Sequence, residues 1–101
     1  MTLTPGQRWF SVVCDTEVIL IRAPGDDVTI ECGGVPMSTE PPACRGGDLD
    51  PKFASGSIIG KRYGDALERL ELIVTQGGRG SLSVNGALLS VKLARNLPSS
   101  D

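Results

Sequence analysis

Residues 20–37, LIRAPGDDVTIECGGVPM, contain the pattern that decides the fold of this chain. Apolar Val28, Ile30 and Cys32 alternate with polar neighbours, which is the period of a strand with one buried face. Glycine-containing turns stand on both sides of this strand. The segment 35–37 then continues in an extended conformation, because a proline biases the residue before it away from helix. The stretch therefore predicts a β-hairpin.

A second stretch, LIVTQGGRGSLSVNGALL (72–89), lies over residues 20–37 without a gap at an offset of 52. Upstream, GQRW (6–9) resembles GKRY (60–63) at an offset of 54. A three-stranded unit of about 40 residues cannot bury its own apolar face, whereas two such units packed together can. We therefore expect two similar β-units related by a pseudo-two-fold axis.

The 101 residues predict a single all-β domain, a small sandwich or barrel with little or no helix. Repeat unit one spans about 6–37 and repeat unit two about 57–94. A linking loop at 38–56 joins them, and its prolines and glycines prevent a regular element. The polar residues 95–101 are expected to form a frayed tail.

Further strands are expected on both sides of the repeated stretches. Asn85-Gly86 is the strongest two-residue hairpin signal in the chain. The run at 66–74 is compatible with an opening helical turn, but its leucines and valine alternate as in a strand. The expected strands are 8–14, 17–23, 57–63, 66–74, 81–84 and 87–94.

The charge pattern argues against nucleic acid as a partner, because the net charge is −2 and both signs are interspersed. No apolar run approaches the roughly 18 residues of a membrane span, so we expect no membrane association. The first residues show no secretory signal pattern, and three cysteines without a signal predict the cytoplasm. We expect the partner to be another protein, and the sequence is compatible with a monomer or a homodimer.

Cys14, an apolar strand, a glycine turn, an alternating strand and a closing C-G-G-V-P-M together resemble the desulforedoxin-like module, the metal-binding unit at the head of desulfoferrodoxins. That family typically carries C-x-x-C before the strands and C-C-G-x-P-M after them. Here Cys32 matches the first closing cysteine, Gly33 replaces the second, and Glu17 stands three residues after Cys14. The resemblance covers about 8–37. Because the family module pairs as a two-fold homodimer, it implies a tandem fusion of two units.

The resemblance also implies a zinc or iron site, but two of its four cysteine ligands are absent, and such a metal needs four. Cys14, Cys32 and Cys44 are separated by 17 and 11 residues, wider than a C-x₂₋₄-C knuckle. Three readings stay open: a three-cysteine metal site, free thiols that behave as small apolar side chains, and a Cys14–Cys32 disulfide. The candidate fourth ligands are Asp15, Glu17 and Asp48.

Arg8 and Arg62 each precede an aromatic residue, Trp9 or Tyr63, at equivalent positions of the repeat. Stacked arginine and aromatic side chains would offer a platform for a ligand or peptide, although we favour a structural pair that closes each half of the sheet. Phe53 in the linking loop is the next candidate for partner contact.

Histidine is absent, which removes His-based acid–base catalysis, and no convergent catalytic set remains. QGGRG (76–80) resembles a phosphate-binding loop in composition but lacks the required spacing. We therefore expect a small accessory or partner-binding protein with a degenerate metal site and no cofactor, and we do not expect an enzyme. The alternative is a protein that binds zinc or iron through cysteines, for structure or for electron transfer.

Overall fold

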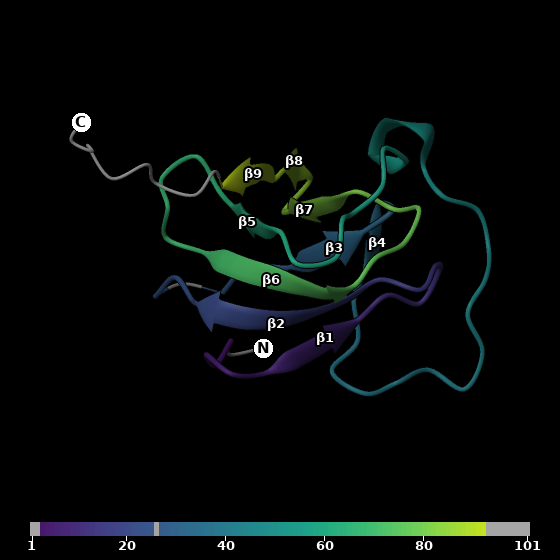
Figure 1. The fold of residues 1–101 in the computed structure, drawn as a ribbon, viewed down its shortest axis with the longest axis horizontal. Helices are drawn as coiled ribbons and strands as arrows, with labels where there is room; N and C mark the ends of the chain where they lie inside the picture. The colour runs from purple at the N-terminus through teal and green to yellow at the C-terminus, as the bar shows by residue number, and fades with distance from the viewer. Residues whose placement is uncertain (1–2, 26, 93–101) are drawn as a thin grey trace.

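A computed structural model describes residues 3–25 and 27–92. The described chain is all-β, as the sequence predicts, and forms two antiparallel sheets (Figure 1). The expected tail at 95–101 and the end of repeat unit two lie outside the described residues. Among the described residues, no helix is long and apolar enough to cross a membrane.

The larger sheet has five strands and the smaller has four, and in both the central pair joins the two halves of the chain. The larger sheet has the order β1 (Arg8–Phe10), β2 (Glu17–Arg22), β6 (Glu71–Gln76), β5 (Arg62–Gly64) and β9 (Ser90–Lys92). The smaller sheet has the order β4 (Val35–Pro36), β3 (Ile30–Cys32), β7 (Leu82–Val84) and β8 (Ala87–Leu88).

A single hydrophobic cluster contains side chains from both sheets. β2 and β6 both contribute fully buried side chains to this cluster. Leu20 on β2 and Leu72 on β6 are examples, and they lie opposite each other in the sheet. Burying a side chain of this size stabilises the fold by roughly 1.5–3 kcal/mol. From the smaller sheet, Ile30, Cys32 and Leu82 are buried in the same cluster.

The expected strand at 87–94 is wrong, because the segment divides between the two sheets. β8 pairs with β7 in the smaller sheet, and β9 pairs with β5 in the larger one. Leu89 between them is buried, and its backbone N–H donates to the carbonyl of Leu82. The hairpin at Asn85-Gly86 is confirmed, and both residues have the positive φ that such a turn requires.

Three other expected strands begin or end in the wrong place. In 57–63, a turn precedes β5, since the Lys61 N–H donates to the Ile58 carbonyl and Gly60 has a φ of 82°. In 8–14, the strand ends at Phe10 because a loop begins at Ser11. The run 66–74 also opens as a turn, and β6 starts only at Glu71.

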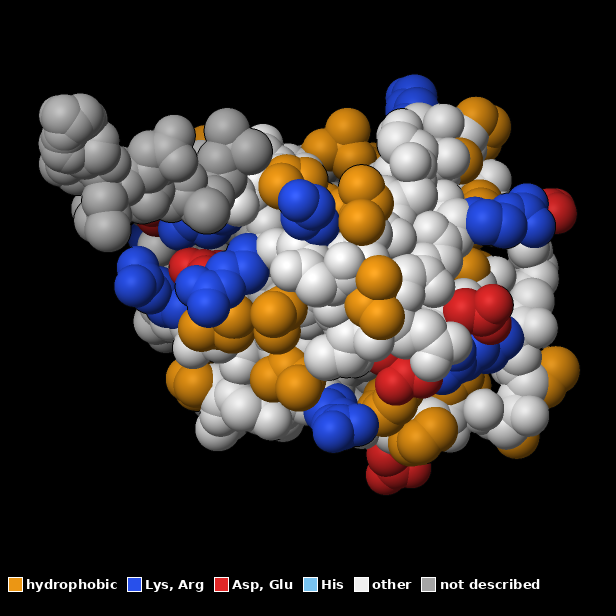
Figure 2. Space-filling view, viewed as in Figure 1, with side chains coloured by type: hydrophobic (Ala, Val, Ile, Leu, Met, Phe, Trp, Pro, Cys, Tyr) orange, Lys and Arg blue, Asp and Glu red, His pale blue; other side chains and the backbone are white. Residues whose placement is uncertain are grey.

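The linking loop at 38–56 runs as a wide arc at one end of the molecule and contains one 3₁₀ turn, Pro51–Phe53 (Figure 1). Figure 2 shows apolar side chains beside a group of Lys and Arg side chains on one face. Among the described residues, the exposed large apolar side chains are those of Ile21, Ile58, Ile59, Leu67, Leu88 and Val91.

Candidate functional site

The fold brings Cys14 and Cys32 together. Cys14 lies in the loop between β1 and β2, and Cys32 is the last residue of β3. Their sulfur atoms are 3.7 Å apart, and both residues are buried, with exposed fractions of 8% and 0%. The sequence singled out these two cysteines, and the fold makes them neighbours.

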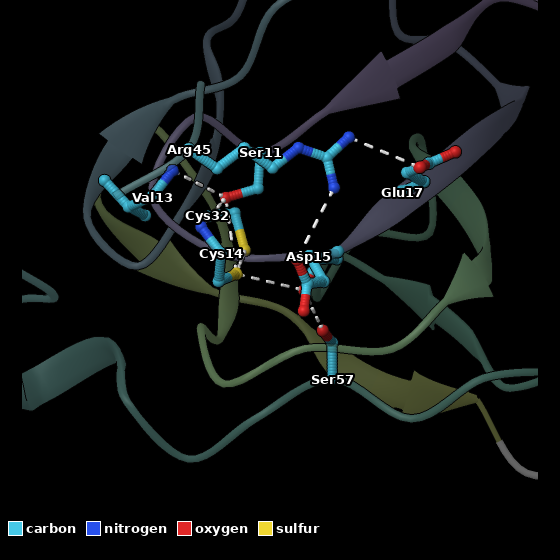
Figure 3. Close-up of polar contacts among 9 residues, drawn as sticks. Ser11, Val13, Cys14, Asp15, Glu17, Cys32, Arg45 and Ser57 are labelled. Carbon is cyan, nitrogen blue, oxygen red and sulfur yellow. Dashed lines mark hydrogen bonds and ion pairs between the residues drawn. The ribbon is translucent and has the colours of Figure 1, made fainter. Parts of the chain in front are cut away.

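Buried hydroxyl groups surround the Cys14 sulfur (Figure 3). Cys14 Sγ lies 3.3 Å from Ser11 Oγ and 3.3 Å from Thr16 Oγ1. Thr16 Oγ1 in turn lies 2.6 Å from Ser57 Oγ, and Ser57 directly follows the linking loop. Ser11 Oγ also accepts hydrogen bonds from the backbone N–H groups of Val13 and Cys14, so this serine shapes the loop that carries the cysteine.

These surroundings separate the acidities of the two thiols. Burial opposes ionisation of Cys14, but hydrogen bonds from Ser11, Thr16 and the Gly80 backbone outweigh it and lower the pKa from 9.0 to about 7. Burial, together with repulsion from Cys14, raises the pKa of Cys32 from 9.0 to about 12. The site therefore pairs a thiol that ionises near neutrality with one that stays protonated.

The β6–β7 loop covers the pair with backbone alone. A Cβ atom added at Gly78 would lie 3.1 Å from Cys14 Sγ and 2.4 Å from Thr16 Oγ1. A Cβ added at Gly80 would lie 2.8 Å from Cys32 Sγ. Close packing over the sulfur atoms thus explains Gly78 and Gly80 of QGGRG, whereas a Cβ at Gly77 would lie 2.8 Å from the Ser57 carbonyl oxygen.

An ion-pair cluster lies beside the cysteine loop. Arg45, from the linking loop, lies 3.3 Å from a Glu17 carboxylate oxygen and 3.9 Å from an Asp15 oxygen (Figure 3). Two of the candidate fourth metal ligands are therefore paired with a guanidinium group. This contact also holds the linking loop against the β1–β2 loop.

Cys44 is exposed in the linking loop, whereas Cys14 and Cys32 are buried. Within residues 3–25 and 27–92, no group of three or more Cys, Asp or Glu side chains is arranged to hold a metal ion. Asp48, the last candidate ligand, is also exposed. The described geometry brings together two of the three cysteines.

The paired arginine and aromatic residues divide between surface and core. Trp9 and Tyr63 are 4% and 6% exposed, whereas Arg8 and Arg62 are exposed. The Tyr63 hydroxyl oxygen accepts a hydrogen bond from the Ile58 backbone N–H. Both rings therefore serve the core, and their guanidinium neighbours are the groups that face solvent. Phe53 is half-buried and is the last residue of the 3₁₀ turn.

A second feature is an open groove of about 1080 Å³ along β5 and β9. Arg22, Lys61, Arg62 and Lys92 contribute positive charge to its walls. Glu71, buried on β6, contacts Arg62 at 3.4 Å and Lys92 at 3.3 Å, so one carboxylate connects three strands. Hydrogen bonds from the Lys92 ammonium group to Glu68 and to Glu71 raise the pKa of Lys92. The basic side chains in Figure 2 mark this side of the molecule.

Sequence reasoning missed the hydroxyl residues and glycines of the cysteine site. The available signal was the spacing S-x-x-C-x-T at 11–16, in which the hydroxyl residues flank Cys14 within three positions. Ser57 carries no comparable signal, because it reaches the site from a distant segment. Comparisons with protein-family models, curated proteins and solved structures found no match to this chain.

Proposed function

We propose that this protein is a small accessory module that acts by binding another protein through the groove along β5 and β9. The observation that carries the proposal is the combination of a large open groove, the exposed cationic side chains of Lys61 and Arg62 on its wall, and the edge strand of the described larger sheet at one place. Edge strands present unpaired backbone groups to which an extended segment of a partner can add.

Charge and apolar exposure define the partner's chemistry. Lys61 and Arg62 are exposed on one wall, and Ile58 and Ile59, one glycine before them in the chain, have exposed fractions of 55% and 64%. Exposed apolar side chains beside charged ones are typical of protein-binding surfaces. The complementary partner is an extended segment that carries carboxylate groups next to an apolar side chain.

Site-specific photo-crosslinking tests this proposal in the cells that make the protein. A photoreactive amino acid in place of Ile59 is expected to give a discrete adduct with a second protein, and Lys61→Glu is expected to abolish it. The matched control places the same group at Glu40, which is exposed in the linking loop. No adduct at Ile59, equal adducts at both positions, or an adduct with another copy of this chain would each refute the proposal.

We also propose that the chain consists of two tandem units with pseudo-two-fold symmetry. The pairings of β1 with β2 and of β5 with β6 support this, since Arg8↔Ile19 corresponds to Arg62↔Ile73 at an offset of 54. In the smaller sheet, β3 and β7 pair symmetrically. At an offset of 52, Ile30 corresponds to Leu82 and Cys32 corresponds to Val84, so the pair Ile30↔Val84 corresponds to the pair Leu82↔Cys32.

Backbone hydrogen bonds support the same correspondence. Gly6 N–H donates to the Leu20 carbonyl, and Gly60 N–H donates to the Val74 carbonyl. The strand bounds support a two-residue slip after the second strand of each proposed unit, in 23–29, whereas the gap-free alignment implies a slip before Leu20.

We also propose that the fold is desulforedoxin-like and that its metal site is degenerate. At an offset of 52, Val84 takes the place of Cys32, and at an offset of 54, Glu68 takes the place of Cys14. The second unit therefore has neither cysteine. This difference supports a lost metal site in unit two and a retained thiol pair in unit one.

A further inference from the structure

We propose that Cys14 and Cys32 form a reversible dithiol–disulfide couple that a hydroperoxide oxidises, with Cys14 as the reacting sulfur and Cys32 as the resolving sulfur. This inference goes beyond partner binding, because it assigns a chemical reaction to the interior of the first unit. It rests on the position, cover and neighbours of the two sulfur atoms.

Proximity is the first requirement, and the fold meets it. A disulfide forms without backbone movement only between cysteine residues that already lie close together. The sulfur atoms of Cys14 and Cys32 are 3.7 Å apart. The bond would join the β1–β2 loop to the end of β3. No strand has to move past another for the sulfurs to meet.

The neighbours of the two sulfurs assign their roles. Cys14 Sγ has two hydroxyl groups at 3.3 Å that can donate to a thiolate, whereas Cys32 is fully buried beside it. A thiolate is the attacking species in thiol oxidation, so Cys14 reacts first. The protonated Cys32 thiol then lies within reach of the oxidised sulfur.

The reaction balances with one peroxide for each disulfide. The Cys14 thiolate attacks one oxygen of hydrogen peroxide, the O–O bond breaks, and the departing hydroxide takes a proton to become water. Cys14 is then a sulfenic acid. The Cys32 thiol gives up its proton, its sulfur attacks Cys14 Sγ, the S–O bond breaks, and a second water leaves. Two thiols are oxidised and one peroxide is reduced to two waters.

The cover of the site selects a small oxidant. Cys14 retains 8% exposure, and the adjacent Gly78 and Gly80 present only backbone above the pair. Hydrogen peroxide is close to water in size. A disulfide on another folded protein is much bulkier, and it would have to reach the buried sulfur itself in order to react. A small hydroperoxide therefore matches the access that this site offers.

The test uses the full chain with Cys44→Ser, which removes the exposed thiol and leaves the pair intact. The protein is treated with one equivalent of hydrogen peroxide at pH 7 and then denatured and alkylated. Intact mass spectrometry is expected to show a loss of two hydrogens and no alkylation, and dithiothreitol is expected to restore both thiols. Peptide mapping is expected to link residues 14 and 32.

Single-cysteine variants in the same background separate the roles. Cys32→Ala is expected to stop at a sulfenic acid on Cys14, which dimedone captures, and Cys14→Ala is expected to slow oxidation of Cys32 at least about tenfold. Circular dichroism establishes that each variant is folded. Persistence of both thiols in the folded Cys44→Ser protein, faster oxidation of Cys32 than of Cys14, or stoichiometric zinc or iron in the purified wild-type protein would overturn the proposal.

Discussion

The two cysteines illustrate how the residue scale decides chemistry in this protein. Both thiols are buried in one cluster, but hydrogen bonds with hydroxyl and backbone groups outweigh burial at Cys14, whereas burial and the neighbouring Cys14 dominate at Cys32. The two neighbouring thiols therefore have pKa shifts in opposite directions. A thiol that ionises near neutrality next to a protonated thiol is the arrangement that disulfide formation requires.

The pH dependence of stability follows from the lowered pKa of Cys14. Because the folded-state pKa is about 7 and the unfolded value is 9.0, the ionised thiol stabilises the fold above pH 9, and this contribution is lost as the pH falls through 7. The free energy of unfolding of the wild type, minus that of Cys14→Ala, is expected to rise by about 2 kcal/mol from pH 7 to pH 9. Urea denaturation measures it, with Cys44→Ala as the control. A difference that stays flat or falls over this range would exclude a stabilising thiolate.

Gly80 tests the close cover of the pair. A methyl group there would lie 2.8 Å from Cys32 Sγ and 2.9 Å from the Gly33 backbone nitrogen, so Gly80→Ala is expected to destabilise the fold by about 1–3 kcal/mol. Gly25→Ala is the matched control, because its Cβ would meet nothing within 4 Å and neither glycine has a positive φ. Chemical denaturation compares the two, and equal stabilities would mean that the loop is loosely packed.

At the scale of elements, alternation and turn signals predicted where strands occur but not where each one ends. The apolar run 8–14 looks continuous, yet Ser11 accepts two backbone hydrogen bonds and ends β1. The run 87–94 alternates well, but the chain crosses from one sheet to the other at Leu89. Both strand ends were predicted wrongly because they depend on hydrogen bonds to other residues. A pattern of alternating apolar and polar residues carries no information about those hydrogen bonds.

The attachment of edge strand β9 depends on Glu71. This buried carboxylate contacts Arg62 on β5 and Lys92 on β9, so Glu71→Gln is expected to weaken the edge by on the order of 1 kcal/mol. Hydrogen–deuterium exchange of β9 amides is expected to accelerate about fivefold, while exchange in β7 is unchanged. Uniform acceleration in both strands would instead indicate a global loss of stability.

At the scale of the whole molecule, the two halves share both sheets. β2 pairs with β6 at the centre of the larger sheet, and β3 pairs with β7 at the centre of the smaller one. The all-β class was predictable because apolar alternation fills both halves of the sequence. The meeting of Cys14 with Cys32 was not, since a separation of 17 residues along the chain does not specify distance in space.

Shared sheets predict that neither half folds alone. Fragments 1–50 and 51–101 are each expected to lack cooperative unfolding, because each lacks the partner of its central strands. Mixing the two is expected to restore the β-sheet circular dichroism signal and a cooperative transition. A half that folds cooperatively in isolation would mean that the central pairings are dispensable.

The Cβ chemical shifts of Cys14 and Cys32, recorded by NMR before and after one equivalent of hydrogen peroxide, report the state of the dithiol most directly. Both shifts are expected to move together into the range of disulfide-bonded cysteine and to return with dithiothreitol, while the amide resonances of β2 and β6 keep their positions. If both Cβ shifts stay at their thiol values while the Cys44 resonance alone changes, the buried pair is a structural part of the core and has no redox function.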